Sequence, residues 1–456
     1  MERFGDIMST RTVLPGKPSL RRTLGVFDGI TLLIGIMIGA GIYSTPQIIA
    51  GYLGSFSTII FLWILVACFV FISGLIYAEL GTRLPHTGGE YVYISRCFGP
   101  FAGFMFGWAQ LFIIRTSAAA SLAIVTADYV QSLFKLSGFA HTAVALSVIV
   151  LLGILNYVGI HRASFFQKIS TVLKIGGLFA LVVIGLLLIQ SQKNLLSTTA
   201  APTGELGLIG NAVAAIMLIF FTHTGWDRVG YVAGEMKNPR RVVPMSLVFG
   251  IGIVVAVYAL TNMVYHRTLG IEGMRGSSTV AVDVATALIG APGAVFIALL
   301  VIISATGSIN GTMMTAPRAY YAMAKDGLFF KWLDFVHPRF RTPSRAILAH
   351  CFWAAAILLI RRKFETIAVG MVFVLLIFLI LNTFALFKLR KGEVGGKNVY
   401  RLPFYPFLPW FFIAGILVLL VFRVISEWKS SLVDVAFLAS GLPFSLIWYR
   451  RKIKEG

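Results

Sequence analysis

Twelve long apolar stretches, separated by short polar connections, constrain the fold of this 456-residue chain more than any other feature. A helix needs about 20 residues to cross the hydrocarbon core of a bilayer, and the stretches are about that long or longer. Backbone groups in lipid must be paired within the crossing segment, so we expect helices throughout. The predicted spans are 25–50, 56–81, 100–130, 142–160, 168–190, 208–235, 243–266, 288–318, 344–360, 366–388, 405–423 and 431–449.

The composition agrees with a multi-pass membrane protein and excludes an ordinary soluble enzyme. Hydrophobic residues make up 58% of the chain and charged residues only 12%, whereas soluble domains hold about 25% charged residues. The net charge of +21 would suggest nucleic acid in a soluble protein. Here the basic residues lie mainly between spans, so we expect a lipid bilayer around the chain and no nucleic-acid partner. Cys68, Cys97 and Cys351 fit no metal-ligand spacing, and neither a metal nor a cofactor is expected.

The distribution of basic residues predicts that both termini are cytosolic. With the N-terminus inside, cytosolic segments hold about 26 Lys and Arg and the opposite side about nine. Residues 1–24 are then a cytosolic tail and residues 450–456 a cytosolic C-terminus. One connection disagrees with this orientation, because Arg361, Arg362 and Lys363 would lie outside.

The first and sixth spans are interrupted in their middles. Gly39-Ala40-Gly41, followed by Pro46, interrupts the first span, and polar residues around Gly225 interrupt the sixth. Membrane helices also carry glycine at close-packing positions, but two interruptions five spans apart are typical of an inverted-repeat transporter. We therefore predict an all-α membrane protein with inverted repeat 1 at 25–190, inverted repeat 2 at 208–390 and two further helices at 405–449.

The interruption of the first span suits a zwitterion. Glycines allow the backbone to unwind and a ligand to approach it closely. The outer half-helix, beginning near Ile42, presents free N–H groups to a carboxylate. The inner half, ending near Ile36, presents carbonyl groups to an ammonium group. This geometry favours an amino acid over a sugar.

Several side chains near the interruption of the sixth span are candidates for a gate. Phe221 and Trp226 either cover the substrate as a lid or face the lipid as ordinary aromatic residues. His223 either senses pH or is a neutral, hydrogen-bonded histidine. Asp227 and Arg228 either contact the substrate or belong to a gating salt-bridge network, because ionisable residues in a membrane usually face the protein interior.

Two cations lie among apolar neighbours within the spans. Lys174, about one turn into span five, either exchanges protons, ties span one to span five as a fixed cation, or extends to the membrane surface. Arg115 in span three keeps its proton, so we expect it to contact a carbonyl or carboxylate group. The candidate carboxylate partners of Arg115 and Arg228 are Glu79, Asp128 and Glu235.

Five short motifs follow one another along nearly the whole chain. They are Gly39-Ala40-Gly41-Ile42-Tyr43, Ala78-Glu79-Leu80-Gly81 with Pro85 and Gly88-Gly89-Glu90-Tyr91, Ile114-Arg115-Thr116-Ser117, Gly225-Trp226-Asp227 with Glu235-Met236-Lys237-Asn238-Pro239 and Pro244, and Gly307-Ser308-Ile309-Asn310-Gly311 with Arg318. Together they resemble the amino acid–polyamine–organocation superfamily and, within it, the L-type amino acid transporter branch.

The resemblance implies the leucine-transporter fold, with ten core helices in two inverted repeats and two further helices. It places the substrate midway across the membrane, with its carboxylate on the amides of the glycine motif and its amino group on carbonyls of both interrupted spans. The implied substrate-binding residues, with their neighbours, are Ile36, Gly39, Ala40, Gly41, Ile42, Phe221, Thr222 and Thr224.

The resemblance also implies roles in gating and coupling. Phe221 falls where the branch has a gating aromatic residue, and the predicted gate consists of Phe221, Trp226, Asp227, Arg228 and Arg115. Lys174 matches the span-five lysine that, in sodium-independent relatives, stands where sodium-coupled members bind an ion. This match points away from sodium and towards exchange or proton coupling.

The predicted function is a sodium-independent secondary transporter of amino acids that works by alternating access. Thr224 narrows the expected side-chain space and favours small or medium neutral substrates, although Asp227 would attract a cationic one. The alternatives are a cation-coupled importer of another amine or cationic amino acid and, more remotely, a channel. The histidines lack metal-ligand or nucleophile spacing, so we do not expect an enzyme.

A covalent partner subunit is not expected. Animal members of the branch pair with a single-span glycoprotein through a cysteine between spans three and four, and residues 131–141 contain no cysteine. The expected form is a stand-alone permease of prokaryotic type, multi-pass in the plasma (inner) membrane, with an amino acid as its substrate.

Overall fold

The computed structural model describes residues 22, 24–85, 88–134, 136–188, 204–325, 327–396 and 399–445. The predicted tail at 1–24, except Arg22 and Leu24, and the predicted C-terminus at 450–456 lie outside the described residues. Within them all regular secondary structure is helical, apart from one isolated bridge between Leu24 and Met236. The predicted all-α architecture is confirmed.

Ten helical segments among the described residues are long and apolar enough to cross a membrane, and α10 is a shorter apolar helix. The helices within the predicted first repeat are α2 (Val26–Met37), α3 (Gly41–Ser44), α4 (Pro46–Leu53), α5 (Phe56–Arg83), α6 (Glu90–Ala109), the π-helix η1 (Gln110–Ile114), α7 (Arg115–Phe134), α8 (Gly138–Val158) and α9 (Ile160–Leu188). Those within the predicted second repeat are α10 (Gly207–Thr222), α11 (Arg228–Tyr231), η2 (Ala233–Glu235), α12 (Pro239–Gly276), α13 (Val280–Lys325), η3 (Lys331–Leu333), α14 (Ser344–Arg361) and α15 (Phe364–Lys391). The last two helices are α16 (Phe407–Ser426) and α17 (Trp428–Ala439).

Three of the long helices bend at a glycine with positive φ. The angles are 86° at Gly99 in α6, 68° at Gly270 in α12 and 73° at Gly290 in α13. Glycine adopts these values without the steric strain that a Cβ atom brings. Each bend joins a membrane span to a shorter helical stretch, which explains why the spans predicted at 100–130 and 288–318 are shorter than the continuous helical segments Glu90–Phe134 and Val280–Lys325.

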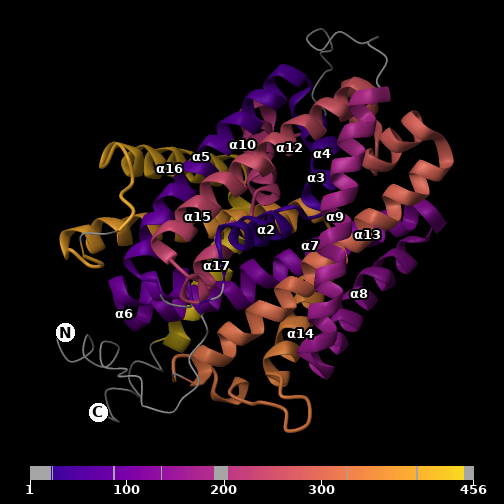
Figure 1. Cartoon of the computed structure of the whole chain (residues 1–456). Helices are drawn as coiled ribbons and strands as arrows, with labels where there is room; N and C mark the ends of the chain where they lie inside the picture. Colours follow the sequence, from indigo (N-terminus) through magenta and orange to yellow (C-terminus); the bar gives the residue numbers. More distant parts are fainter. Residues whose placement is uncertain are drawn as a thin grey trace.

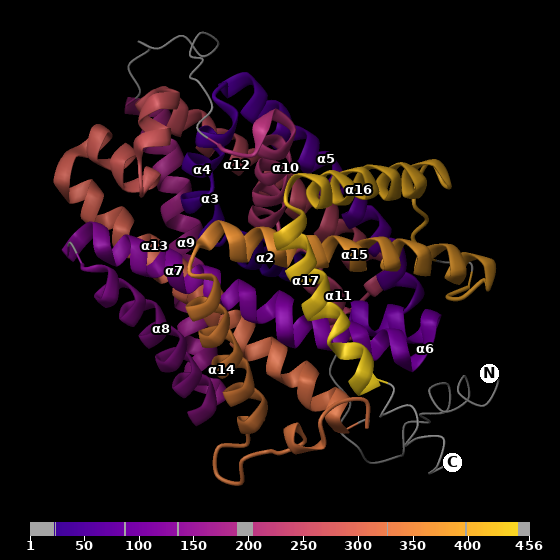
Figure 2. The same cartoon turned by 180° about the vertical axis from the view of Figure 1, so that it is seen from behind.

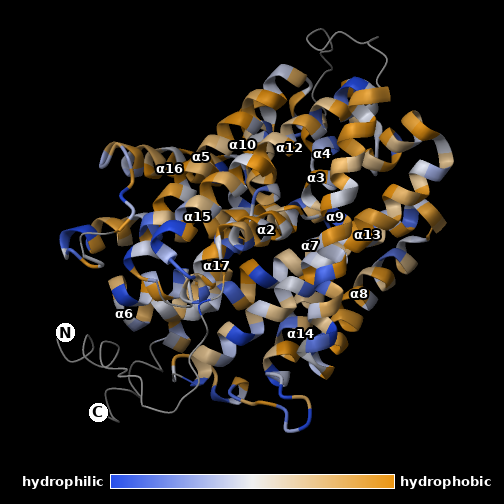
Figure 3. Ribbon diagram, viewed as in Figure 1, coloured by the Kyte–Doolittle hydropathy of each residue, from blue (hydrophilic) through white to orange (hydrophobic). Residues whose placement is uncertain are grey.

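The helices form one bundle in which α2 lies in the middle and is surrounded by others in both views (Figure 1, Figure 2). Helix α2 contacts α9, α11 and α12, while α16 lies at the edge of the bundle against α5, α10 and α15. Hydrophobic residues predominate along the outer helices, and hydrophilic residues gather at their ends (Figure 3). The large apolar side chains on the outside, such as Val172 and Phe352, are about 70% exposed, as expected where lipid covers them.

Candidate functional site

The first membrane helix is broken between α2 and α3. Helix α2 ends at Met37, the next residue Ile38 is extended (φ −69°, ψ 92°), and α3 begins at Gly41. No described residue accepts a hydrogen bond from the amides of Ala40, Gly41 or Ile42, all of which are buried. Buried amides are nearly always paired in proteins. Three adjacent unpaired ones therefore form a position where an anionic group can bind.

A second break separates α10, which ends at Thr222, from α11, which begins at Arg228. Gly225 lies in this break with φ of 116°, and a Cβ atom there would be only 2.8 Å from Ile36 Cγ2 and 3.4 Å from the Ile36 carbonyl oxygen. Only glycine fits this close approach. The two breaks, far apart in sequence, therefore touch in the centre of the bundle.

A second contact joins the same two segments. A Cβ atom on Gly41 would be 3.0 Å from Cα of Thr222, and the hydroxyl oxygens of Thr45 and Thr222 are 2.9 Å apart. The hydroxyl of Thr224 donates to the Phe221 carbonyl oxygen at 2.8 Å and so turns back onto its own chain. The structure thus brings the two predicted substrate-binding segments into contact, at Ile36 with Gly225 and at Gly41 with Thr222.

Tyr258 of α12 joins both breaks, and the sequence analysis missed it. Its hydroxyl donates to the Met37 carbonyl oxygen at 2.8 Å and lies 3.4 Å from the Thr222 carbonyl oxygen. Its ring packs against His223 and Trp63 with centroid distances of 5.2 and 6.0 Å. Tyr258 lies in an apolar span outside every motif, so no sequence signal distinguishes it.

Asp227 is the carboxylate partner of both arginines near the second break. Its Oδ2 atom lies 3.1 Å from Nη2 of Arg115 and 3.2 Å from Nε of Arg228. Arg228 also donates to the Thr315 hydroxyl at 3.2 Å. All three charged side chains are at most 16% exposed, so this network links α7, α11 and α13 inside the bundle.

None of the three candidate carboxylates is the partner of Arg115 or Arg228, so this prediction was wrong. Asp128 lies further along α7, the helix that begins with Arg115, and Glu79 and Glu235 lie on other segments. Glu79 pairs with Arg83 and Arg390, Asp128 pairs with His141, and Glu235 ends η2.

The two aromatic residues of the predicted gate contact different helices. Phe221 is 5% exposed and meets Phe364 of α15 edge to face, with ring centroids 5.4 Å apart. Trp226 is equally buried and meets Tyr77 of α5, with centroids 4.7 Å apart. His223 is buried as well, and its Nδ1 atom lies 2.9 Å from the Ile219 carbonyl oxygen.

A fully buried carboxylate, Glu90, lies next to the ion-pair network. Its Oε1 atom accepts hydrogen bonds from Tyr77 at 2.6 Å and from Asn382 at 3.2 Å, and Tyr231 donates to Oε2 at 3.4 Å. These bonds join α6 to α5, α15 and α11. The acidic residue directly after Gly88-Gly89 was visible in the sequence, but its partners were not.

Lys174 is 1% exposed and lies near the middle of α9, deeper than the sequence suggested, because α9 begins at Ile160 rather than near 168. The lysine therefore does not extend to the membrane surface. Ser170 packs against Gly307 and Gly177 against Leu300, as the space beside these glycines shows. These contacts pair α9 with α13 on both sides of Lys174 in the sequence.

Three buried polar atoms of α9 and α13 have no partner in the part of the chain that the structure describes. Neither Nζ of Lys174 nor the hydroxyls of Ser304 and Ser308 has a hydrogen-bond partner among the described residues. The Ser308 hydroxyl reaches the glycine motif, because a Cβ atom on Gly39 would be 3.4 Å from its Oγ atom. Within the described ranges, no three His, Cys, Asp or Glu side chains are close enough together to hold a metal ion.

A buried polar site between two broken helices, at the centre of a bundle of membrane-spanning helices, defines a secondary transporter. Residues 24–438 match the family model described as amino acid permease, so the chain belongs to the amino acid permease family. This membership confirms the resemblance noted in the motifs and the fold class that it implied.

Three relatives illustrate the range of the family. The chain is 30% identical over 445 residues to the serine/threonine exchanger SteT of Bacillus subtilis (strain 168), with 96% of this chain and 98% of the relative covered. It is 27% identical to the human b(0,+)-type amino acid transporter 1, with 76% and 72% covered. It is 28% identical to the human cystine/glutamate transporter, with 73% and 67% covered.

Proposed function

We propose that this permease exchanges small or medium neutral amino acids across the membrane by alternating access, without sodium. The observation that carries the proposal is the contact between the two broken helices, where the amides of Ala40, Gly41 and Ile42 have no partner among the described residues. Backbone groups at membrane depth need partners, and amides that find none in the protein are available to water or to a bound ligand. The likeness to a serine/threonine exchanger over nearly the whole chain supports exchange.

The amino acid binds through its backbone groups. Its carboxylate accepts hydrogen bonds from the three free amides beside Gly39. Its ammonium group donates to carbonyl oxygens of Ile36, which borders Gly225, and of the last turn of α10. Both partners are backbone groups, so this part of the site recognises any α-amino acid.

A small or medium side chain fits the space that remains. The side chains of Thr222 and Phe221 crowd the junction, and a Cβ atom on Gly41 would already be 3.2 Å from the Thr222 hydroxyl. The Ser308 hydroxyl beside Gly39 has no described partner and can bind a substrate hydroxyl group. Asp227 is occupied by two arginines, so a cationic substrate gains no support from it.

Lys174 supports independence from sodium. Its ammonium group is buried on α9, without a hydrogen-bond or carboxylate partner among the described residues. In the protein interior the effective dielectric constant is lower than in water, so a fixed positive charge there repels a metal cation strongly. Lys174 therefore takes the place of a coupling ion.

The gate consists of two contacts on opposite sides of the substrate. The contact of Phe221 with Phe364 joins the C-terminal end of α10, before the break, to α15. The ion-pair network of Arg115, Asp227 and Arg228 lies after the break, at the start of α11, and joins α11 to α7 and α13. Alternating access requires that these contacts open in turn, so that the site faces one side at a time.

The chain is proposed to act alone in the plasma (inner) membrane, with both termini cytosolic. The excess of basic residues in the connections assigned to the cytosol supports this orientation. The connection at 131–141 has no cysteine for a link to a partner subunit.

Reconstituted vesicles test the proposal. The purified chain is placed in sodium-free liposomes that are either empty or preloaded with unlabelled serine, and uptake of labelled serine, threonine, leucine, arginine and glutamate is followed. We expect serine and threonine uptake into loaded vesicles only. Uptake into empty vesicles that rises with an inward proton gradient would instead indicate a proton symporter, and a requirement for sodium would contradict the proposal. Protein-free liposomes are the control.

A further inference from the structure

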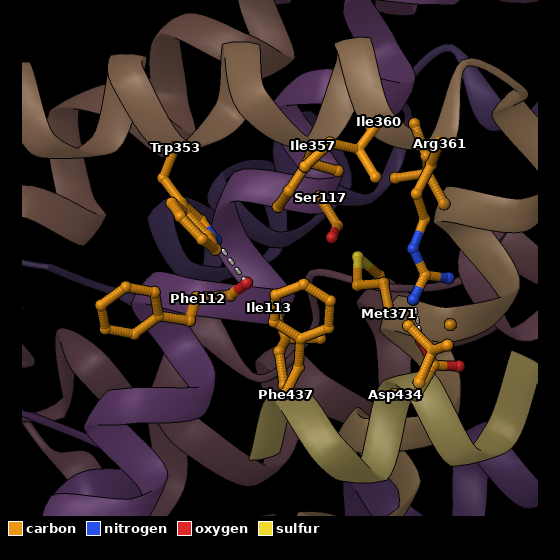
Figure 4. Close-up of a pocket in the computed structure, with 13 residues that line it drawn as sticks. Phe112, Ile113, Ser117, Trp353, Ile357, Ile360, Arg361, Met371, Asp434 and Phe437 are labelled. Atoms are coloured by element: carbon orange, nitrogen blue, oxygen red, sulfur yellow. Dashed lines mark hydrogen bonds and ion pairs between the residues drawn. The ribbon is translucent and has the colours of Figure 1, made fainter. Parts of the chain in front are cut away.

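A pocket lies between α7, α14, α15 and α17, away from the broken helices (Figure 4). About 480 Å³ of empty space lies in the pocket and in the open region in front of its mouth. Buried residues, among them Ile113, Ser117 and Met371, form its inner wall. Ile360 and Val433 form its mouth and are 68% and 44% exposed on the outside of the bundle. Because lipid covers the outside, the pocket opens towards the bilayer.

One end of the pocket is polar. Arg361, the last residue of α14, forms an ion pair with Asp434 of α17 and donates to the Thr366 carbonyl oxygen at 3.3 Å. Gly370 makes room for the pair, since a Cβ atom there would be 2.7 Å from Asp434 Oδ1. Asp434 is 2% exposed, and no described residue donates a hydrogen bond to its Oδ2 atom. A buried acceptor without a donor is costly, so a ligand that donates a hydrogen bond is favoured here.

The other end of the pocket is aromatic. Trp353, Phe112 and Phe437 line it, and Ile357 lies between them and the ion pair (Figure 4). Arg361 follows Trp353 by eight positions in α14, which corresponds to about 12 Å along the helix axis. The pocket is therefore polar at the end of α14 and apolar towards the interior of the bilayer. A phospholipid has the same order, with a polar headgroup at the membrane surface and an acyl chain below it.

We propose that this pocket binds one acyl chain of an anionic phospholipid whose headgroup carries hydroxyl groups. The turn between α14 and α15 adjoins the polar end and exposes Arg362 and Lys363. Their two positive charges outweigh the single negative charge of the nearby Glu365. They attract the phosphate group, while a headgroup hydroxyl donates to Oδ2 of Asp434. The basic connection that contradicts the orientation of the other loops is thus explained as a lipid-binding rim.

The bound chain also contacts the segment that carries the gate. Ile113 and Ser117 line the pocket, and Arg115, which lies between them, is paired with Asp227 of the second break. Ile113 belongs to the π-helix η1, where the helical hydrogen bonding changes. An acyl chain against this wall supports the conformation in which Arg115 reaches Asp227.

Native mass spectrometry of the delipidated full-length chain tests the site directly. Phosphatidylglycerol, phosphatidylethanolamine and phosphatidylcholine with identical acyl chains are added in turn. We expect one retained phosphatidylglycerol per chain, bound about tenfold more tightly than phosphatidylcholine, which corresponds to about 1.4 kcal/mol. The measurement concerns lipid binding only, so it does not depend on which solute the protein transports.

Matched variants locate the binding. Val433→Trp blocks the mouth and should weaken retention about tenfold or more, whereas Val435→Trp, at a residue 42% exposed on the same helix but outside the pocket, should behave as the parent does. Ile357→Trp fills the pocket from its buried wall, with Leu359→Trp as its control. Arg362→Gln with Lys363→Gln should remove the preference for the anionic headgroup.

Three results would overturn the proposal: that the parent retains no lipid, that it retains phosphatidylcholine as strongly as phosphatidylglycerol, or that both pocket variants retain lipid as strongly as their controls. Preferential binding of phosphatidylethanolamine would likewise contradict the assignment of an anionic ligand.

Discussion

The guanidinium group of Arg115 lies 3.1 Å from the carboxylate of Asp227 and joins the start of α7 to the non-helical segment that precedes α11. The same oxygen of Asp227 lies 3.2 Å from Nε of Arg228. One carboxylate oxygen therefore holds two cations in a buried place. Neither arginine has another ion pair among the described residues, so Asp227 is the residue of the proposed gate whose neutralisation leaves the most uncompensated charge.

Asp227→Asn should reduce amino acid exchange at least tenfold, because it leaves two buried arginines without a counter-charge. Breaking a buried pair by removing one partner destabilises a protein by about 3–5 kcal/mol. Initial rates of exchange in proteoliposomes measure the effect. Asp128→Asn is the control, since Asp128 pairs with His141 in a more exposed place. Equal rates in the two variants would contradict a role of Asp227 in the gate.

The positions of the two breaks could be predicted because they are properties of the local backbone. The sequence placed the end of the first half-helix near Ile36 and the start of the second near Ile42, and the structure has Met37 and Gly41. Glycine and proline in an apolar span disturb the helix whatever its neighbours in the bundle are. The residues proposed to bind a substrate lie at these breaks, so they could be proposed from the sequence without knowledge of the fold.

The partners across the bundle could not be predicted in the same way. Arg115 was recognised as an unusual charge, but its partner lies 112 positions further along the chain. Tyr258 gave no signal at all, because a tyrosine is unremarkable in an apolar helix until a carbonyl group lies beside its hydroxyl. Such pairings depend on how the helices pack, and packing is not visible in hydropathy or spacing.

Tyr258→Phe should raise the KM for the exchanged amino acid about tenfold, since the ring remains but its hydrogen bond to the Met37 carbonyl oxygen is lost. One such bond contributes about 0.5–1.5 kcal/mol. Tyr265→Phe is a close control, because Tyr265 is buried in the same helix and its hydroxyl has no described partner. Concentration-dependent exchange rates measure both variants, and an equal change in both would argue against Tyr258 as a positioning residue.

Lys174→Ala should abolish exchange in sodium-free vesicles while the protein is still produced and remains monodisperse. The substitution removes the buried positive charge on α9 that is proposed to stand in place of a coupling ion. Lys168→Ala, at an exposed position of the same helix, should leave exchange unchanged. Normal sodium-free exchange by Lys174→Ala would remove this residue from the mechanism.

Phe221→Ala should slow turnover more than it weakens substrate binding, because the contact with Phe364 closes the site and backbone groups bind the substrate. Truncating any buried phenylalanine also destabilises a protein, by about 3–5 kcal/mol. Phe220→Ala controls for this loss, since Phe220 is 6% exposed and Phe221 is 5% exposed. Separate values of kcat and KM decide the matter, and a rise in KM alone would place Phe221 in the binding site rather than in the gate.

Glu79→Gln should lower the melting temperature in detergent without changing substrate affinity. Glu79 is completely buried at the end of α5 and accepts hydrogen bonds from Arg83 at 2.8 Å, from Arg390 at 2.7 Å and from the Leu402 amide at 2.7 Å. The neutral side chain leaves two arginines uncompensated, and the expected loss is about 3–5 kcal/mol. Glu272→Gln removes an ion pair whose glutamate is 63% exposed and should cost less than about 1 kcal/mol. If both variants unfold at the same temperature, Glu79 does not stabilise the junction of α5 with the end of α15.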